Sequence, residues 1–317
     1  MLEPTGKNEK RSAALSSVFA AVGLTAIKLT VGFLTNSLGI LAEAAHSALD
    51  LVAAAMTYLA VRFSDKPADL DHHFGHGKIE NLSALFETLL LLGTSAWVIY
   101  EAVQRLFLIS VRVESSIWSF VIMGLSIAID FTRSRRLARA ARKYHSQALE
   151  ADALHFSTDI WSSAVVILGL IGLSLARFFP GMVWFSKADS LAALVVAGIV
   201  LYVSARLGGR TIAVLVDTAP TGQVERIKKA ASVEGVSDVH AVRIRPSGPN
   251  WFVDLHVTMN GNIHLHRAHA ATEEIERQVQ EIVPGADVTV HVEPLEAVER
   301  PRSKKRVSVR DKRPRRM

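Results

Sequence analysis

The apolar stretch over residues 38–62 carries three ionisable side chains near its middle. Its sequence, LGILAEAAHSALDLVAAAMTYLAVR, is long enough to cross a bilayer, which takes about 20 residues as a helix. Glu43, His46 and Asp50 lie within it, and ionisable residues at membrane depth are costly and typical of functional sites. Because His46 and Asp50 are four residues apart, one face of a helix presents both to a single ion.

The same spacing recurs about a hundred residues later. His155 and Asp159 are four residues apart in EADALHFSTDIWSSAVVILGLIG, a second apolar stretch. One such pair could serve helix packing alone, but two pairs at overlapping depths favour a shared site. Two carboxylates and two imidazoles complete a tetrahedral site for a divalent metal ion. Glu43 and Asp152, three residues before the histidines, are candidates for lining the paths to that site.

Hydropathy predicts six membrane-spanning helices in total. Hydrophobic residues make up 50% of the 317 residues and charged residues 21%, which is too apolar for an ordinary soluble domain. Lys28, inside the first span, is expected to pair or to snorkel rather than to bind metal. The candidate spans are residues 12–34, 38–62, 79–107, 115–133, 147–176 and 183–206.

Basic residues concentrate on alternate sides of these spans. Lys7, Lys10 and Arg11 precede the first span, and the 133–146 segment holds six lysines and arginines. The positive-inside rule therefore predicts that both termini are cytoplasmic.

The composition changes to that of a soluble domain after residue 208. The apolar residues have helical spacing over 220–233 and 265–283, and they alternate with polar residues over 236–246, 250–259 and 286–293. This pattern predicts the order αββαβ, a two-layer α+β domain. We expect a tail over 1–11, a membrane domain over 12–207, a cytoplasmic domain over 208–296 and a basic disordered tail over 297–317. The basic tail could also be attracted to anionic membrane lipid.

The residue types in the chain limit which metal ions it can bind and which energy source it can use. The chain has no cysteine, so a metal must be held by imidazole and carboxylate, which suits zinc, cobalt, nickel, iron or manganese. The sequence contains no GxxxxGK[ST] phosphate loop, which disfavours a nucleotide-driven pump. The net charge of +6 lies mainly in loops and tail, which indicates topology rather than nucleic-acid binding. Imidazole titrates near pH 6.5, so protons and metal compete for the same ligands, as an antiporter requires.

Three segments in order resemble the cation diffusion facilitator family: NSLGILAEAAHSALD, PADLDHHFGHGKIENLSALFE and ADALHFSTD. The resemblance covers residues 12–294 and implies a homodimeric antiporter in a bacterial inner membrane that exports Zn²⁺ or a related divalent ion in exchange for protons. Many bacterial members carry Asp where His46 stands, which favours zinc or cobalt and puts cadmium in doubt. Zn²⁺ would be both substrate and regulatory ligand, with Co²⁺, Cd²⁺, Fe²⁺ or Mn²⁺ as further candidates.

The resemblance also implies sites outside the membrane. Asp69, His72 and His76 match the family's loop ligands, and Lys78 and Asp217 match a charge pair near the dimer interface. A binuclear zinc site that tightens the dimer and senses cytoplasmic metal is implied for His240, His256, His269, His291 and Glu293. Family members usually have Asp in place of Glu293, and His264 and His266 could join the site or be exposed.

Other functions stay open from the sequence. The chain could be a membrane-anchored metal sensor without transport, or an exporter of Fe²⁺, Mn²⁺, Co²⁺ or Ni²⁺. A membrane-embedded metalloenzyme is disfavoured because there is no HExxH motif and no evident catalytic base, so we do not expect an enzyme.

Overall fold

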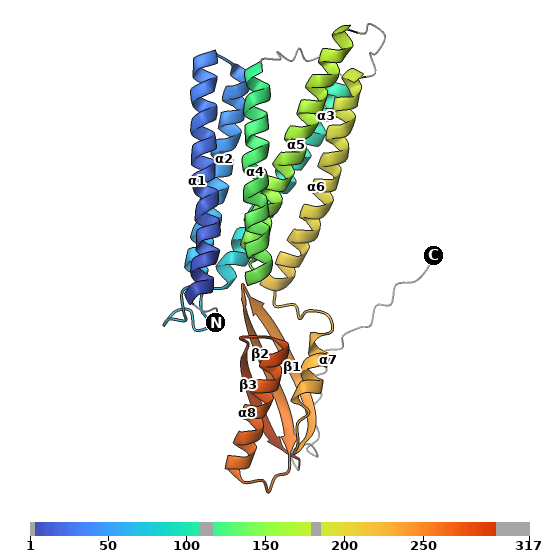
Figure 1. The fold of residues 1–317 in the computed structure, drawn as a ribbon. Helices are drawn as coiled ribbons and strands as arrows, with labels where there is room; N and C mark the ends of the chain where they lie inside the picture. The colour runs from blue at the N-terminus through green and yellow to red at the C-terminus, as the bar shows by residue number, and fades with distance from the viewer. Residues whose placement is uncertain (1–3, 108–116, 179–184, 296–317) are drawn as a thin grey trace, which may run out of the picture. The chain divides into compact units, whose positions relative to one another are not determined.

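Six long helices precede a small α+β domain in the computed structural model, which describes residues 4–107, 117–178 and 185–295 (Figure 1). The long helices are α1 (Pro4–Thr35), α2 (Leu38–Ser64), α3 (Lys78–Phe107), α4 (Ile117–Tyr144), α5 (Gln147–Phe178) and α6 (Phe185–Leu215). They are followed by α7 (Gln223–Ala231), β1 (Val236–Ser247), β2 (Asn250–Met259), α8 (Leu265–Ile282) and β3 (Asp287–Pro294).

Three of the long helices extend well beyond the predicted spans, by about eight residues or more. α1 already begins at Pro4, inside the segment expected to be a tail, and α6 continues to Leu215, past the expected domain boundary. α4 continues through most of the basic 133–146 segment, which was expected to be a loop. The reason is that the sequence SRRLARAARKY consists mainly of strong helix formers, so a charged segment outside the apolar region remains helical.

The bundle has the surface of a membrane domain. Within the described residues, four helical segments are long and apolar enough to cross a membrane: Gly6–Thr35, Glu43–Ser64, Lys78–Gln104 and Ala193–Leu215. Large apolar side chains such as Phe33, Leu49 and Trp97 are exposed on the outside of the helices. Small residues fill much of the interior, as is typical where membrane helices approach closely.

Two apolar clusters connect the helices around the centre of the bundle. The larger joins α1, α2, α4 and α5 through small residues such as Ala14 and Ala54 packed near Phe156. The second joins α3, α5 and α6 through Ala84, Ala151 and Leu207. Helix α5 belongs to both clusters, so its side chains lie at the junction of the two groups of helices.

The C-terminal elements follow the predicted αββαβ order. The three strands form one sheet in the order β1-β2-β3, with α7 and α8 packed together. Alternate residues of the central strand are buried, namely Val253, Leu255 and Val257, and the helices bury Ile227, Ile275 and Val279. Gly248, at φ +57°, makes the turn between β1 and β2, a backbone conformation that glycine adopts without strain.

The chain divides into two compact units. The first contains Met1–Pro220 together with the β1–β2 turn region, Ile244–Phe252, and Gly285–Asp287. The second contains Thr221–Arg243, Val253–Pro284 and the remainder of the chain. Within the first unit, the loop end is the end of the helix bundle where residues 65–77 join α2 to α3, and the far end is the opposite one.

Candidate metal centres

The four residues predicted inside the membrane converge between α2 and α5. His155 Nε2 lies 3.2 Å from Asp50 Oδ1 and 3.6 Å from Asp159 Oδ2. His46 Nε2 lies 3.8 Å from Asp50 Oδ1 and 3.8 Å from Asp159 Oδ1. Each imidazole thus faces both carboxylates, although the two helices are far apart in sequence.

These separations suit a tetrahedral metal ion. With metal–ligand bonds of about 2.0–2.2 Å, neighbouring ligand atoms of a tetrahedron are roughly 3.3–3.6 Å apart. The four nitrogen–oxygen distances are 3.2–3.8 Å, close to that range. Ligand atoms of His46, Asp50 and Asp159 all lie within 4.8 Å of one another, whereas His155 is outside this group and must shift to complete four-coordination. Two carboxylates offset the charge of a divalent ion, and two neutral imidazoles complete its coordination.

A cavity of about 200 Å³ opens beside this cluster. His46, His155 and Asp159 line one part of it. The rest is lined by further residues of α5 and by residues between Thr94 and Ala102 of α3 and between Ala193 and Val200 of α6. The α3 and α6 segments lie in the far halves of their helices. The cavity therefore extends from the cluster into the far half of the bundle, and its wall carries hydroxyl groups and, besides Asp159, the carboxyl group of Glu101.

The loop end is closed by a buried ionic network that the sequence analysis missed. Lys10 Nζ of α1 lies 2.7 Å from Asp65 Oδ1 and 2.7 Å from Glu80 Oε1, and the Lys10 side chain is fully buried. Ser64 Oγ donates to Glu80 at 2.7 Å, and Ser146, just before α5, also donates to Glu80. Charged residues at the end of an apolar helix give no sequence signal that they are buried, because a solvated position has the same composition.

The two acids predicted to line the paths have different surroundings. Glu43 is half exposed and pairs with Lys28 at 3.1 Å, so Lys28 forms an ion pair, one of the two outcomes expected for it. Asp152 is fully buried and accepts a hydrogen bond from Ser17 at 3.4 Å. Arg133 donates to the same serine hydroxyl at 3.1 Å, which brings α1, α4 and α5 together beside Asp152.

The loop cluster is assembled by a tight turn. Asp69 Oδ1 lies 3.1 Å from His72 Nδ1, and Asp69 Oδ2 lies 3.4 Å from His76 Nε2. Asp69 also accepts hydrogen bonds from the backbone N–H of His72 and Asp71, and these, above all the one from His72, lower the pKa of its carboxyl group. Gly75 permits the turn with φ +72°. These three side chains could hold one metal ion.

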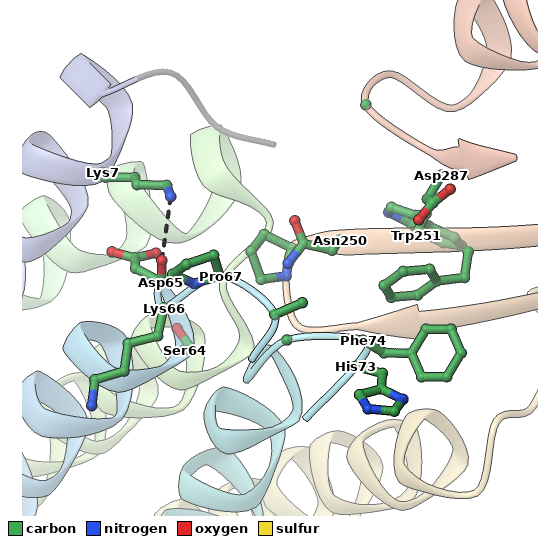
Figure 2. A pocket seen from close by; sticks show the side chains of 15 residues that line it. Lys7, Ser64, Asp65, Lys66, Pro67, His73, Phe74, Asn250, Trp251 and Asp287 are labelled. Atoms are coloured by element: carbon green, nitrogen blue, oxygen red, sulfur yellow. Dashed lines mark hydrogen bonds between the residues drawn. The ribbon is translucent and has the colours of Figure 1, made fainter. Parts of the chain in front are cut away.

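His73, left without a role in the sequence analysis, does not join the loop cluster. Its ring lies 2.9 Å from the backbone oxygen of Leu70. Figure 2 shows it beside Phe74 at a separate cavity of about 130 Å³ that Trp251 and Asn250 also line. His73 is thus a neighbouring histidine outside the cluster and a natural control for it.

A third cluster forms in the second unit around Glu293. His256 Nδ1 lies 2.9 Å from Glu293 Oε1, and His240 Nε2 lies 3.3 Å from Glu293 Oε2. His291 is near, with its ring centroid 4.7 Å from that of His256. The hydrogen bond with His256 is the largest cause that lowers the pKa of Glu293. The glutamate therefore bridges two strands through its histidine partners.

His269 lies apart from this cluster within one chain. It is exposed on α8 and faces Glu273, with His269 Nε2 3.5 Å from the glutamate oxygen. His264 and His266 stack on each other with ring centroids 5.8 Å apart. A single chain thus gathers four of the five residues predicted for this site, because α8 carries His269 on an exposed face.

The predicted charge pair also forms. Lys78 Nζ, at the start of α3, lies 2.8 Å from Asp217 Oδ1, just after α6. Asp217 has φ +58°, which ends the helix and turns its side chain back to the lysine. Both side chains are exposed, so the contact contributes little stability within one chain.

Comparison with known proteins identifies the family. Residues 14–216 match the family model described as Cation efflux transmembrane domain, and residues 220–295 match Cation efflux protein, cytoplasmic domain. The chain belongs to the cation diffusion facilitator family. The family is one of membrane transporters, so the predicted family and fold class are confirmed and the chain is a multi-pass membrane protein.

Similar family members share nearly their whole length with this chain. The cation-efflux pump FieF of Salmonella arizonae is 31% identical over 293 residues, which cover 91% of this chain and 94% of FieF. FieF of Citrobacter koseri is 32% identical over 305 residues, with 95% and 97% covered. A solved structure of CzrB in its zinc form matches a shorter part of the chain. The matched region is 32% identical and comprises 26% of this chain and 96% of the CzrB chain, with a TM-score of 0.24.

Proposed function

We propose that this protein exports a divalent metal ion, zinc foremost, from the cytoplasm in exchange for protons. The observation that carries the proposal is the convergence of His46, Asp50, His155 and Asp159 from two membrane helices at 3.2–3.8 Å. Ionisable groups at this depth are retained where an ion or substrate passes. Membership of a cation efflux family supports the same direction of transport.

Competition between protons and metal at these ligands provides the coupling. A metal ion requires neutral imidazoles and ionised carboxylates, so its binding displaces protons. When the ion leaves, each imidazole lies near two carboxylates, and those negative charges favour renewed proton binding. Loading from one side and release to the other then moves protons in the opposite direction to the metal.

The two ends of the bundle support alternating access. The cavity extends from the cluster into the far half of the bundle, while the buried Lys10–Asp65–Glu80 network occupies the loop end. We place both termini and the loop end in the cytoplasm of a bacterium whose inner membrane holds the protein, which agrees with the positive-inside rule. The conformation is then one that releases metal outward.

The other clusters have supporting roles in this proposal. The loop cluster of Asp69, His72 and His76 binds cytoplasmic metal, and the Glu293 cluster binds regulatory metal in a homodimer, where His269 completes it from an exposed face. Lys78 and Asp217 stabilise the dimer below the membrane. Glu43 and Asp152 line the outer and the cytoplasmic path respectively.

Reconstitution in liposomes tests the transport reaction directly. Zinc flux and internal pH are followed together in vesicles under an imposed pH gradient. We expect proton-coupled zinc flux in the unmodified protein and its loss in Asp50→Ala and in Asp159→Ala. Glu150→Gln is the matched control, because Glu150 is an exposed carboxylate of α5 that pairs with Arg210. Flux that persists in both aspartate variants would overturn the site assignment.

A further inference from the structure

Glu87 of α3 is a buried carboxyl group without an ionic partner. Its side chain is fully buried, Oε1 accepts a hydrogen bond from Thr57 of α2, and Oε2 has no hydrogen-bond partner. Within the described residues it forms no ion pair, whereas Glu80 on the same helix pairs with Lys10 and Asp130 on α4 pairs with Arg133. The sequence analysis assigned no role to Glu87.

Its depth places it between the proposed transport site and the closed loop end. Thr57 lies seven residues after Asp50 on α2, which is about 10 Å nearer the loop end. Glu87 makes no hydrogen bond or ion pair with the four proposed metal ligands among the described contacts. It lies beyond the transport site on the way to the Lys10–Asp65–Glu80 network.

The charged groups around Glu87 come mainly from α5. Asp152 and His155 exert the strongest electrostatic effects on it, and Arg133 of α4 acts in turn on Asp152. On the α2 side, the described hydrogen-bond partner of Glu87 is the hydroxyl group of Thr57. The two arginines of α6 nearest the loop end, Arg206 and Arg210, are exposed, and Arg210 is paired with Glu150. No described cation therefore neutralises Glu87 directly.

A proton fits this position better than a metal ion. An ionised carboxylate in a buried, low-dielectric position is costly unless a cation or a proton neutralises it. A divalent ion needs several ligand atoms. Glu87 offers only one oxygen without a partner, and Asp152, the acid that acts on it electrostatically, offers one more, Oδ1. A proton bound to that oxygen removes the charge and needs no further ligand.

We propose that Glu87 binds and releases one of the protons exchanged for the metal ion, an inference that rests on the proposed antiport function. While the transport site is empty of metal, Glu87 Oε2 holds a proton. When a divalent ion enters the site, its positive charge favours the ionised form of Glu87. The O–H bond then breaks, the carboxylate keeps the electron pair, and the proton leaves to water on the loop side.

The test compares zinc and proton fluxes measured in the same vesicles. Glu87→Gln keeps an oxygen that accepts from Thr57 but cannot carry a proton. We expect zinc to be bound and transported, with the number of protons moved per zinc ion reduced by one. Thr57→Val removes the hydrogen bond but leaves the carboxyl group, so we expect the same number of protons per zinc ion as in the unmodified protein. The exposed control Glu150→Gln should also leave this number unchanged.

The outcomes separate this inference from the antiport itself. Zinc flux without any proton movement in the unmodified protein refutes antiport. A proton-to-zinc ratio that is normal in the unmodified protein and unchanged in Glu87→Gln refutes the role of Glu87 alone. If Glu87→Gln does not fold, infrared difference spectra recorded on zinc addition provide the test. In the unmodified protein the C=O band of a protonated carboxyl group must disappear when zinc binds, and in Glu87→Asp this band must be shifted. Absence of the band, or a band unaffected by Glu87→Asp, overturns the inference.

Discussion

His155 Nε2 of α5 lies 3.2 Å from Asp50 Oδ1 of α2, so a buried contact joins residues that are 105 positions apart. His155 also faces Asp159 one turn along its own helix at 3.6 Å. The imidazole is therefore a link between the two halves of the four-residue cluster. Changes at this residue affect both metal binding and the α2–α5 contact.

The first prediction concerns that link. His155→Gln removes one metal ligand and keeps a polar side chain of similar reach. We expect zinc affinity to fall by more than about 100-fold, since changes to groups that only support a metal ligand already cost about 10–100-fold. Equilibrium zinc binding to the detergent-solubilised protein measures it. Affinity within about threefold of the unmodified protein, in a folded variant, would exclude His155 as a ligand.

The second prediction concerns metal preference at His46. His46→Asp replaces an imidazole by a shorter carboxylate, which leaves a wider ligand cage and adds a negative charge. We expect cadmium flux to rise relative to zinc flux, because a larger ion then fits among the ligands. Parallel flux assays with each metal in liposomes give the ratio. A ratio that stays the same or falls would show that selectivity lies elsewhere.

The third prediction concerns the stability of the loop end. Lys10→Met leaves Glu80 buried without an ionic partner, whereas Asp65 keeps Arg11 at 2.9 Å. We expect a loss of about 3–5 kcal/mol of folding stability. Thermal unfolding in detergent measures the change. Lys143→Met is the matched control, because Lys143 pairs with Glu9 at 2.6 Å on an exposed surface and should cost at most about 1 kcal/mol. Equal losses in the two variants would contradict the closed network.

The fourth prediction concerns the Glu293 cluster and acid. The hydrogen bond with His256 lowers the pKa of Glu293 in the folded protein, so this stabilisation is present above the ordinary glutamate pKa and is lost as the pH falls through the lowered value. Unfolding temperatures of the full chain should therefore decline below about pH 4.5 more steeply in the unmodified protein than in Glu293→Gln. Parallel curves would show that this contact does not contribute.

The fifth prediction concerns the loop cluster. His76→Ala should lower the number of zinc ions bound per chain by one under conditions that saturate the unmodified protein, because Asp69 and His72 alone leave too few ligands. His73→Ala, in the same loop but outside the cluster, should leave the number unchanged. Metal analysis of the purified protein counts the ions. Loss in both variants would point to a general effect on the loop.

Several features could be predicted from the sequence because they depend on local periodicity. A helix places residues four apart on one face, so the spacing of His46 with Asp50 and of His155 with Asp159 was sufficient to pair them. Alternating apolar residues predicted β2 with its observed bounds of Asn250–Met259. The ends of α1, α4 and α6 were less predictable, since charged helix formers continue a helix beyond the membrane.

The amino-acid sequence by itself determined the six helices, the αββαβ order and the two half-sites, because each depends on residues close together along the chain. Only the tertiary structure brought Lys10 to Glu80, left Glu87 without an ionic partner and separated His269 from the Glu293 cluster. The physical reason is that the burial and pairing of a charge depend on which helices meet at its depth. The sequence does not show which helices pack together there, because a glutamate in an apolar helix has the same local sequence whether it faces a lysine, a hydroxyl group or another acid.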